Sequence, residues 1–176
     1  MNYASTIKEL GRGTAGSRDL PFDEARQLYG AILDGGVPDL EVGAITIALR
    51  MKGEAVEEMH GFLAAACERV HALRRPQGRI RPVVIPTYNG ARKGANLTPL
   101  LALLLQRFGV PVLLHGLIEG YGRVTTAQIL REYAATTGGA LAPCTTHQQA
   151  QQAMDEHGLA FVPLPVLSPG LNEQLA

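Results

Sequence analysis

The sequence is poor in the residues that cross-link a chain or anchor it in a membrane. Its 176 residues include no tryptophan, only two cysteines, and no run of 18 apolar residues of the kind that crosses a bilayer. The first 16 residues lack the apolar segment of a secretion signal. Cys67 and Cys144 lie far apart, so we expect two reduced thiols in a cytoplasmic protein without a membrane partner.

Acidic residues are absent from a long central stretch of the chain. Arg69–Ile118 contains no Asp or Glu but eight Lys or Arg, although the whole chain has a formal net charge of zero. Eleven of its sixteen acids precede residue 69. A neutral total argues against a uniformly basic nucleic-acid binder. The stretch either presents one basic face to a polyanion or is a solvated segment whose arginines pair with the acidic N-terminal helices.

Recognisable metal sites are also missing from the sequence. It contains no His-Glu-x-x-His motif, and residues 69–118 offer no carboxylate that could hold Mg²⁺. Cys144 and His147 form a Cys-x-x-His without a second pair of zinc ligands. We therefore expect no resident metal or cofactor.

Apolar residues recur at helical spacing through the first 75 residues, which predicts an all-helical bundle domain. Helices are expected at about 3–10, 21–35, 39–51 and 54–75. The third of these is apolar nearly all round, which is typical of a helix buried on more than one side. It is either a central core helix or the contact of a homodimer. We assign residues 1–75 to a helical dimerisation domain.

The character of the sequence changes after residue 75. Residues 76–82 are rich in Pro, Gly and Arg and indicate a hinge. The following residues alternate between apolar runs and helical patterns, which predicts a mostly parallel α/β sheet over 83–176. Strands are expected at Val83–Ile85, Val110–Leu114 and Leu159–Pro163. Because three strands do not complete such a sheet, we expect 83–176 to be the first part of a longer α/β domain.

The stretch Val83–Leu100, VVIPTYNGARKGANLTPL, predicts a buried strand, a polar loop and a helix start. Pro86 should end the strand, and Asn96 should cap the helix. The loop has neither the lysine–hydroxyl pair of a P-loop nor a Gly-x-Gly-x-x-Gly, but it carries Arg92 and Lys93. Free amides at the helix start and these cations predict a phosphate site, whereas a plain polar turn is the other interpretation.

A second polar loop, GLIEGYGR, follows the next strand and should lie at the same sheet edge. The two loops and the hinge supply the residues that we predict to bind phosphate or nucleic acid: Arg79, Arg81, Asn89, Arg92, Lys93, Asn96, Thr98, His115, Arg123 and Thr125. Two aromatic side chains could stack on bases: Tyr88 and Tyr121.

The chain carries a family resemblance. LPFDEARQLYGAILDGGVPDLEVGAITIALRMKGEAVEEMHGF resembles the N-terminal helical domain of anthranilate phosphoribosyltransferase, glycosyltransferase family 3. VVIP, NLTP and GVPVLLHG resemble the start of that family's α/β domain. The resemblance implies a homodimer through the helical domain. It also implies a transferase that binds phosphoribosyl pyrophosphate with Mg²⁺ in the cleft between its domains.

The chain departs from this family at the residues that carry the chemistry. PTYNG at 86–90 replaces a glycine-rich GTGGD loop, and LHGLI at 114–118 replaces KHGNR. YNGARKGANLTPLLALLLQRFGVPVLLHG is more similar to the YbiB-type branch of the superfamily, a resemblance that implies DNA binding with little sequence preference. The alternatives are a phosphoribosyltransferase with an unusual loop and a structural dimer module without a ligand.

Overall fold

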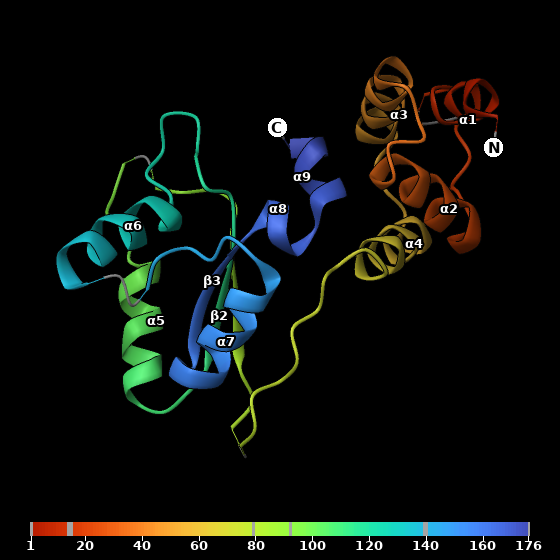
Figure 1. Cartoon of the computed structure of the whole chain (residues 1–176). Coiled ribbons are helices and arrows are strands. Elements are labelled where there is room, and N and C mark those ends of the chain that lie inside the picture. Colours follow the sequence, from red (N-terminus) through yellow and green to blue (C-terminus); the bar gives the residue numbers. More distant parts are fainter. Residues whose placement is uncertain (1, 14–15, 79, 92, 139–140, 176) are drawn as a thin grey trace. The chain divides into compact units, whose positions relative to one another are not determined.

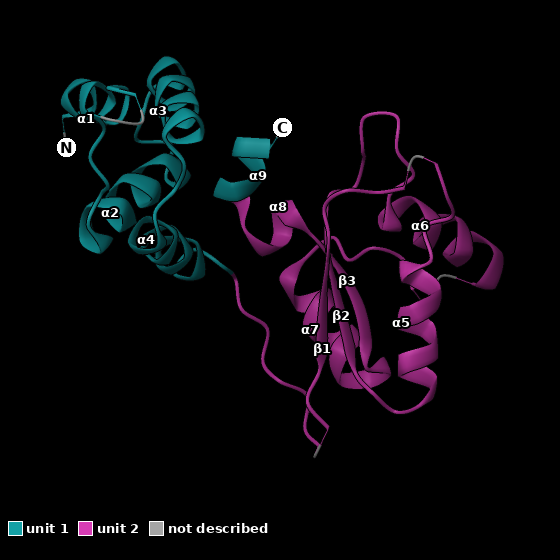
Figure 2. Cartoon of the chain, turned by 180° about the vertical axis from the view of Figure 1, so that it is seen from behind, with its two compact units in different colours: residues 1–70, 170–176 teal, residues 71–169 magenta. Residues whose placement is uncertain are grey.

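The computed structural model describes residues 2–13, 16–78, 80–91, 93–138 and 141–175. The chain divides into two compact units, which Figure 2 colours separately. Residues 1–70 and 170–176 form the first, here called the helical unit, and residues 71–169 form the second, here called the α/β unit. This division differs from the one expected at 75–83, because the hinge residues group with the α/β unit. Residues 170–176 group with the helical unit.

The described part of the helical unit begins with helices that follow one another in the sequence (Figure 1). They are α1 (Tyr3–Leu10), α2 (Phe22–Leu33), α3 (Asp39–Lys52) and α4 (Val56–Cys67), and residues of α9 (Pro169–Leu175) join them. Their core is built on Leu28 and Ile45, which are fully buried. Gly61 lets α4 approach α2 closely, since a Cβ at this position would lie 2.5 Å from the carbonyl oxygen of Phe22.

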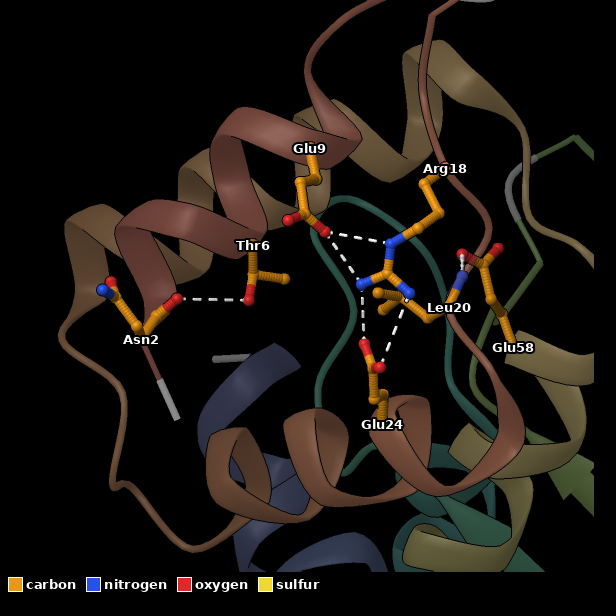
Figure 3. A network of polar contacts seen from close by, with 7 residues as sticks. All are labelled: Asn2, Thr6, Glu9, Arg18, Leu20, Glu24 and Glu58. Atoms are coloured by element: carbon orange, nitrogen blue, oxygen red, sulfur yellow. Dashed lines mark hydrogen bonds and ion pairs between the residues drawn. The ribbon is translucent and has the colours of Figure 1, made fainter.

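Charged side chains link the segment between α1 and α2 to the helices of the helical unit (Figure 3). The Arg18 guanidinium lies 2.8 Å from a carboxylate oxygen of Glu9 in α1 and 2.8 Å from one of Glu24 in α2. Glu58 is fully buried and accepts a 2.8 Å hydrogen bond from the Leu20 amide. It also pairs with Lys52 at 2.8 Å, so this buried carboxylate has a counter-charge.

The helix α4 ends eight residues earlier than the sequence pattern predicts, at Cys67 rather than near Arg75. The reason lies in the α/β unit, where the extended segment that follows makes its own hydrogen bonds. The His71 amide donates to the Leu167 carbonyl at 2.8 Å, and the Arg74 amide donates to the side chain of Gln151 at 2.7 Å. These tertiary bonds replace the helical bonds that the apolar spacing of this segment favours.

The α/β unit is built on a parallel sheet in the order β1-β2-β3. The strands are β1 (Val83–Thr87), β2 (Val112–Gly116) and β3 (Leu159–Pro163). The helices are α5 (Thr98–Arg107), α6 (Thr126–Thr137), α7 (His147–His157) and α8 (Leu164–Leu167). The fold class predicted from the sequence is therefore confirmed: a helical N-terminal domain and part of a parallel-sheet α/β domain.

Side chains of β2 alternate between the two faces of the sheet, as a strand requires. Leu114 packs in the core that α5 and α6 contribute to, whereas Leu113 packs against the core that contains Met154 of α7. The expected end of β1 at Pro86 is wrong, because the strand continues to Thr87. Within the described sheet β1 is an edge strand, where the missing N–H of proline costs no ladder hydrogen bond. Among the described residues, no helix is long and apolar enough to cross a membrane.

Candidate functional site

The loops that follow β1 and β2 lie together at the carboxyl edge of the sheet, as the sequence predicted. The Ala91 amide donates to the Val124 carbonyl at 2.9 Å, and the Val124 amide donates back at 2.8 Å. Gly90 makes this approach feasible, because a Cβ there would lie 2.7 Å from the Val124 oxygen. The two loops therefore act as one paired structure.

A pocket of about 470 Å³ opens between the end of β1, its loop and the start of α5. It is lined by residues 86–91, 95–98 and Thr126. None of these lining side chains is charged, and several carry amide or hydroxyl groups. The described lining is therefore polar and uncharged, and we call this the neutral pocket. Such a lining suits groups that donate and accept hydrogen bonds better than it suits a free pyrophosphate.

Tyr88 lines this pocket, and its hydroxyl lies 3.0 Å from Nδ1 of His115. The two rings meet edge to face, with centroids 5.4 Å apart. Burial raises the pKa of Tyr88 and lowers the pKa of His115, so a neutral phenol and a neutral imidazole share this hydrogen bond near pH 7, and it occupies Nδ1. His115 therefore does not present Nδ1 as a donor to a phosphate.

Asn96 holds the paired loops together and also binds the first amide of α5, although it is not the N-cap residue. Its Nδ2 donates to the Val124 carbonyl and to the Thr126 hydroxyl, each at 3.2 Å. Its Oδ1 accepts from the Thr98 amide at 3.2 Å. The predicted N-cap is wrong by one position, because Leu97 occupies it. The side chain of Asn96 is thus committed to these internal bonds.

The start of α5 offers fewer free amides than the sequence suggested. Asn96 already occupies the Thr98 amide, and Pro99 has no N–H. Because the N-terminal amides are what make a helix start bind anions, this helix end is a weak phosphate site.

Thr125 was predicted to bind a ligand, but it is fully buried and its hydroxyl is not open to one. It caps α6: its Oγ1 accepts from the Gln128 amide at 3.2 Å, while the Gln128 side chain accepts from the Thr125 amide at 2.9 Å. The hydroxyl also donates to the Ile118 carbonyl at 2.8 Å. This capping box fixes the second loop.

The predicted cations do not all gather at this edge. Lys93 is exposed in the first loop, and Arg123 of the second loop donates to the Asn89 oxygen at 3.0 Å. Tyr121 is 82% exposed. Arg81 lies at the opposite end of β1, immediately before the strand. Two further predicted cations, Arg79 and Arg92, fall outside the described residues.

The charges of the two units have opposite sign. The α/β unit has nine Lys or Arg and four Asp or Glu, a net charge of +5, whereas the helical unit has seven and twelve, a net charge of −5. Arg69 pairs with an acidic residue of the helical unit, as one of the two interpretations of the basic stretch predicts, since its guanidinium lies 2.6 Å from the Asp34 carboxylate. Within the described part of the α/β unit, five other cations of the acid-free stretch and second loop make no ion pair: Arg74, Arg81, Lys93, Arg107 and Arg123.

The sequence analysis did not identify Gln151. This buried residue binds both the backbone amide and the backbone carbonyl of Arg74. The only sequence signal is its place in α7, one position after the buried Ala150 and three before the buried Met154. Four glutamines in that helix hide which one faces inward.

Comparison with known proteins shows which class of protein the chain resembles. Residues 4–70 match the family model described as the helical bundle domain of the glycosyl transferase family. The chain is 30% identical over 168 residues to anthranilate phosphoribosyltransferase of Persephonella marina, covering 94% of this chain and 47% of that protein. The chain is thus similar to anthranilate phosphoribosyltransferases, and its residues 4–70 match the helical bundle domain of the glycosyl transferase family.

A more similar relative is the uncharacterized protein YbiB of Escherichia coli K12, which is 48% identical over all 176 residues and 53% of its own length. The structure of anthranilate phosphoribosyltransferase from Thermus thermophilus superposes with a TM-score of 0.75 at 24% identity, over 95% of this chain and 47% of that one. The chain therefore spans about half the length of the curated relatives it matches. These findings confirm the fold and the similarity to YbiB.

Proposed function

We propose that this chain is a cytoplasmic nucleic-acid-binding protein that binds DNA with little sequence preference, as a homodimer. The observation that carries the proposal is the charge of the α/β unit. It has a net charge of +5, and the cations named above make no ion pair within its described part. Unpaired cations on one unit form the electrostatic footprint that a phosphate backbone recognises.

The paired loops supply the proposed contacts. Lys93, together with Arg92 beside it in the sequence, contacts backbone phosphates, and Arg123 does so from the second loop. The neutral pocket accepts a base, with the ring of Tyr88 as its stacking surface. Phosphate contacts of this kind do not distinguish sequences, so the binding is sequence-tolerant and sensitive to salt.

Exposed apolar side chains of α3 support a homodimer through the N-terminal helices. Leu40, Ile47 and Met51 are 84%, 59% and 70% exposed, and their spacing places them along one side of the helix. A contiguous stripe of large exposed apolar residues more often marks an interaction site than a surface that stays in contact with solvent. Ile47→Glu should therefore lower the molar mass measured by light scattering from that of a dimer to that of a monomer.

The experiment that tests the proposal compares two charge reversals. Fluorescence anisotropy of a labelled single-stranded oligonucleotide should show Lys93→Glu weakening the affinity by at least about tenfold, because reversal adds repulsion to the lost contact. The matched control is Lys8→Glu, an exposed position of α1 in the helical unit. It should leave the affinity within about twofold. Equal losses in the two variants would contradict the site.

Phosphoribosyl pyrophosphate with Mg²⁺ is the ligand that the transferase alternative requires, and calorimetry should give no binding heat with it. Tyr88 lines the pocket at the position where the resemblance implies a glycine-rich loop, and the described lining has no charged group for a pyrophosphate. Saturable heat with this ligand, together with absent oligonucleotide binding, would favour the transferase instead.

A further inference from the structure

A second pocket lies at the opposite end of β1, wholly within the α/β unit. Its volume is about 350 Å³, and three arginines line it: Arg74, Arg75 and Arg81. Its described lining includes no Asp or Glu. The pocket is therefore strongly basic, in contrast to the neutral pocket at the carboxyl edge of the sheet.

The floor of this pocket is apolar. Val84 of β1 is 55% exposed, Leu113 of β2 pairs with it, and the buried Met154 of α7 also lines the pocket. The arginines of the lining lie on the segment that leads into β1. An apolar surface below a cationic rim is complementary to a ligand that has both an anionic group and a flat apolar part, as a nucleotide does.

The main chain of Arg74 is held in place from a buried position. Gln151, which is 8% exposed, accepts from the Arg74 amide at 2.7 Å and donates to its carbonyl at 3.2 Å. Its side-chain nitrogen also donates to Asp155 at 3.1 Å. Because both backbone groups of Arg74 are hydrogen-bonded, the position of its Cα, from which the side chain extends, is fixed. Among the described residues, neither Arg74 nor Arg81 makes an ion pair that a phosphate would have to displace.

We propose that this basic pocket is a second nucleic-acid contact, in which Arg74 and Arg81 bind a backbone phosphate and the adjacent nucleoside lies on the apolar floor. This inference rests on the proposed function and extends it. The two pockets lie at opposite ends of β1, whose five residues at about 3.3 Å each place them roughly 15 Å apart. At about 3.4 Å per stacked nucleotide, four or five nucleotides separate the two contacts.

The test uses two labelled thymidine oligonucleotides, of about 4 and about 12 nucleotides, because only the longer one can occupy both pockets. Arg74→Ala/Arg81→Ala should weaken binding of the longer strand by at least about tenfold, through loss of the second contact. The shorter strand should change by no more than about twofold, since the first pocket still accepts it. The control is Arg50→Ala/Arg131→Ala, which removes the same charge from exposed positions of α3 and α6.

The outcomes separate the two proposals. If the arginine variant and the control bind the longer strand equally well, the second contact is wrong and the proposed function stands. If the wild-type chain binds neither strand at low salt, the proposed function is wrong and the second contact fails with it. Arg81→Glu alone gives an independent check, because Arg81 is exposed and its replacement disturbs no hydrogen bond of the described sheet. It should weaken only the longer strand.

Discussion

The two units of this chain use charge in different ways. In the helical unit, several cations contact carboxylates directly, as in Arg18 with Glu9 and Glu24 and in Arg69 with Asp34. In the described part of the α/β unit, His157 and Glu156 approach each other, and they form an ion pair when the histidine is protonated. Pairing on one unit stabilises a fold, whereas the cations named above on the other remain available to a ligand.

The buried polar groups follow the same division. The helical unit buries Glu58 with Lys52 as its partner, so its interior contains an ion pair. The buried polar side chains in the described part of the α/β unit are neutral: Thr87, Thr125, Thr126, Gln151 and Ser168. The first four of these form side-chain hydrogen bonds to loops or main chain. The expected consequence is that buried-charge changes destabilise the first unit, whereas amide and ring changes affect the geometry or the binding of the second.

The largest effect should come from Glu58→Gln in the helical unit. It leaves the Lys52 ammonium, whose side chain is 4% exposed, with the exposed carboxylate of Asp19 at 2.6 Å but without its buried partner. Removing one member of a buried pair costs about 3–5 kcal/mol. Urea unfolding followed by circular dichroism measures the change, with the exposed Glu57→Gln as control. Equal stability of the two variants would show that the buried pair contributes little.

The next largest effect should be the loss of oligonucleotide affinity when the α/β unit loses the Tyr88 ring. Tyr88→Leu removes the ring from the neutral pocket, and stacking contributes about 1–3 kcal/mol per base, so the oligonucleotide affinity should fall roughly 5- to 150-fold. Tyr88→Phe keeps the ring and loses only the hydrogen bond to His115. It should stay near wild type in the same anisotropy assay. If both variants lose affinity alike, the hydroxyl rather than the ring is what matters.

Gln151→Leu tests whether a buried amide supports the α/β unit. The change leaves the amide and carbonyl of Arg74 without their partner, at a cost of about 1–3 kcal/mol. Hydrogen exchange should show faster exchange at the Arg74 amide than in wild type. Gln152→Leu, on the exposed side of the same helix, is the matched control. Unchanged exchange at Arg74 would contradict its proposed anchoring.

The smallest effect is a pH dependence of the α/β unit. Burial lowers the pKa of His115 below its ordinary value of 6.5, so under more acidic conditions the unfolded chain binds a proton that the folded chain does not. The free energy of unfolding should therefore fall as the pH drops below about 6.5. His115→Gln should lose this part of the pH dependence in urea titrations. Parallel pH profiles for wild type and variant would refute the assignment.

Much of the fold could be predicted because it follows from local patterns. The bounds of α1 and β3 agree with those expected, and the two polar loops meet at one sheet edge because parallel strands place their carboxyl ends together. What failed depends on distant partners. The end of α4 is set by hydrogen bonds to Leu167 and Gln151, and no local pattern contains these residues.

The candidate site was predictable in location but not in the role of each side chain. Asn96 and Thr125 are polar loop residues in the sequence, yet the structure uses both for internal bonds. Whether a polar side chain faces solvent or a neighbouring loop depends on the packing of the two loops. Arg81 was grouped with the loops because all lie in one basic stretch, although β1 separates them in space.

The salt dependence of oligonucleotide affinity tests the central claim most directly. Each phosphate neutralised on a single strand contributes about −0.7 to the slope of log K against log salt concentration. Contacts in both pockets predict a slope of about −2 or steeper, with similar values for unrelated sequences. Lys93→Ala should make the slope shallower by about 0.7. A slope near zero, or no binding at low salt, would contradict the claim that the unpaired cations of the α/β unit bind nucleic acid.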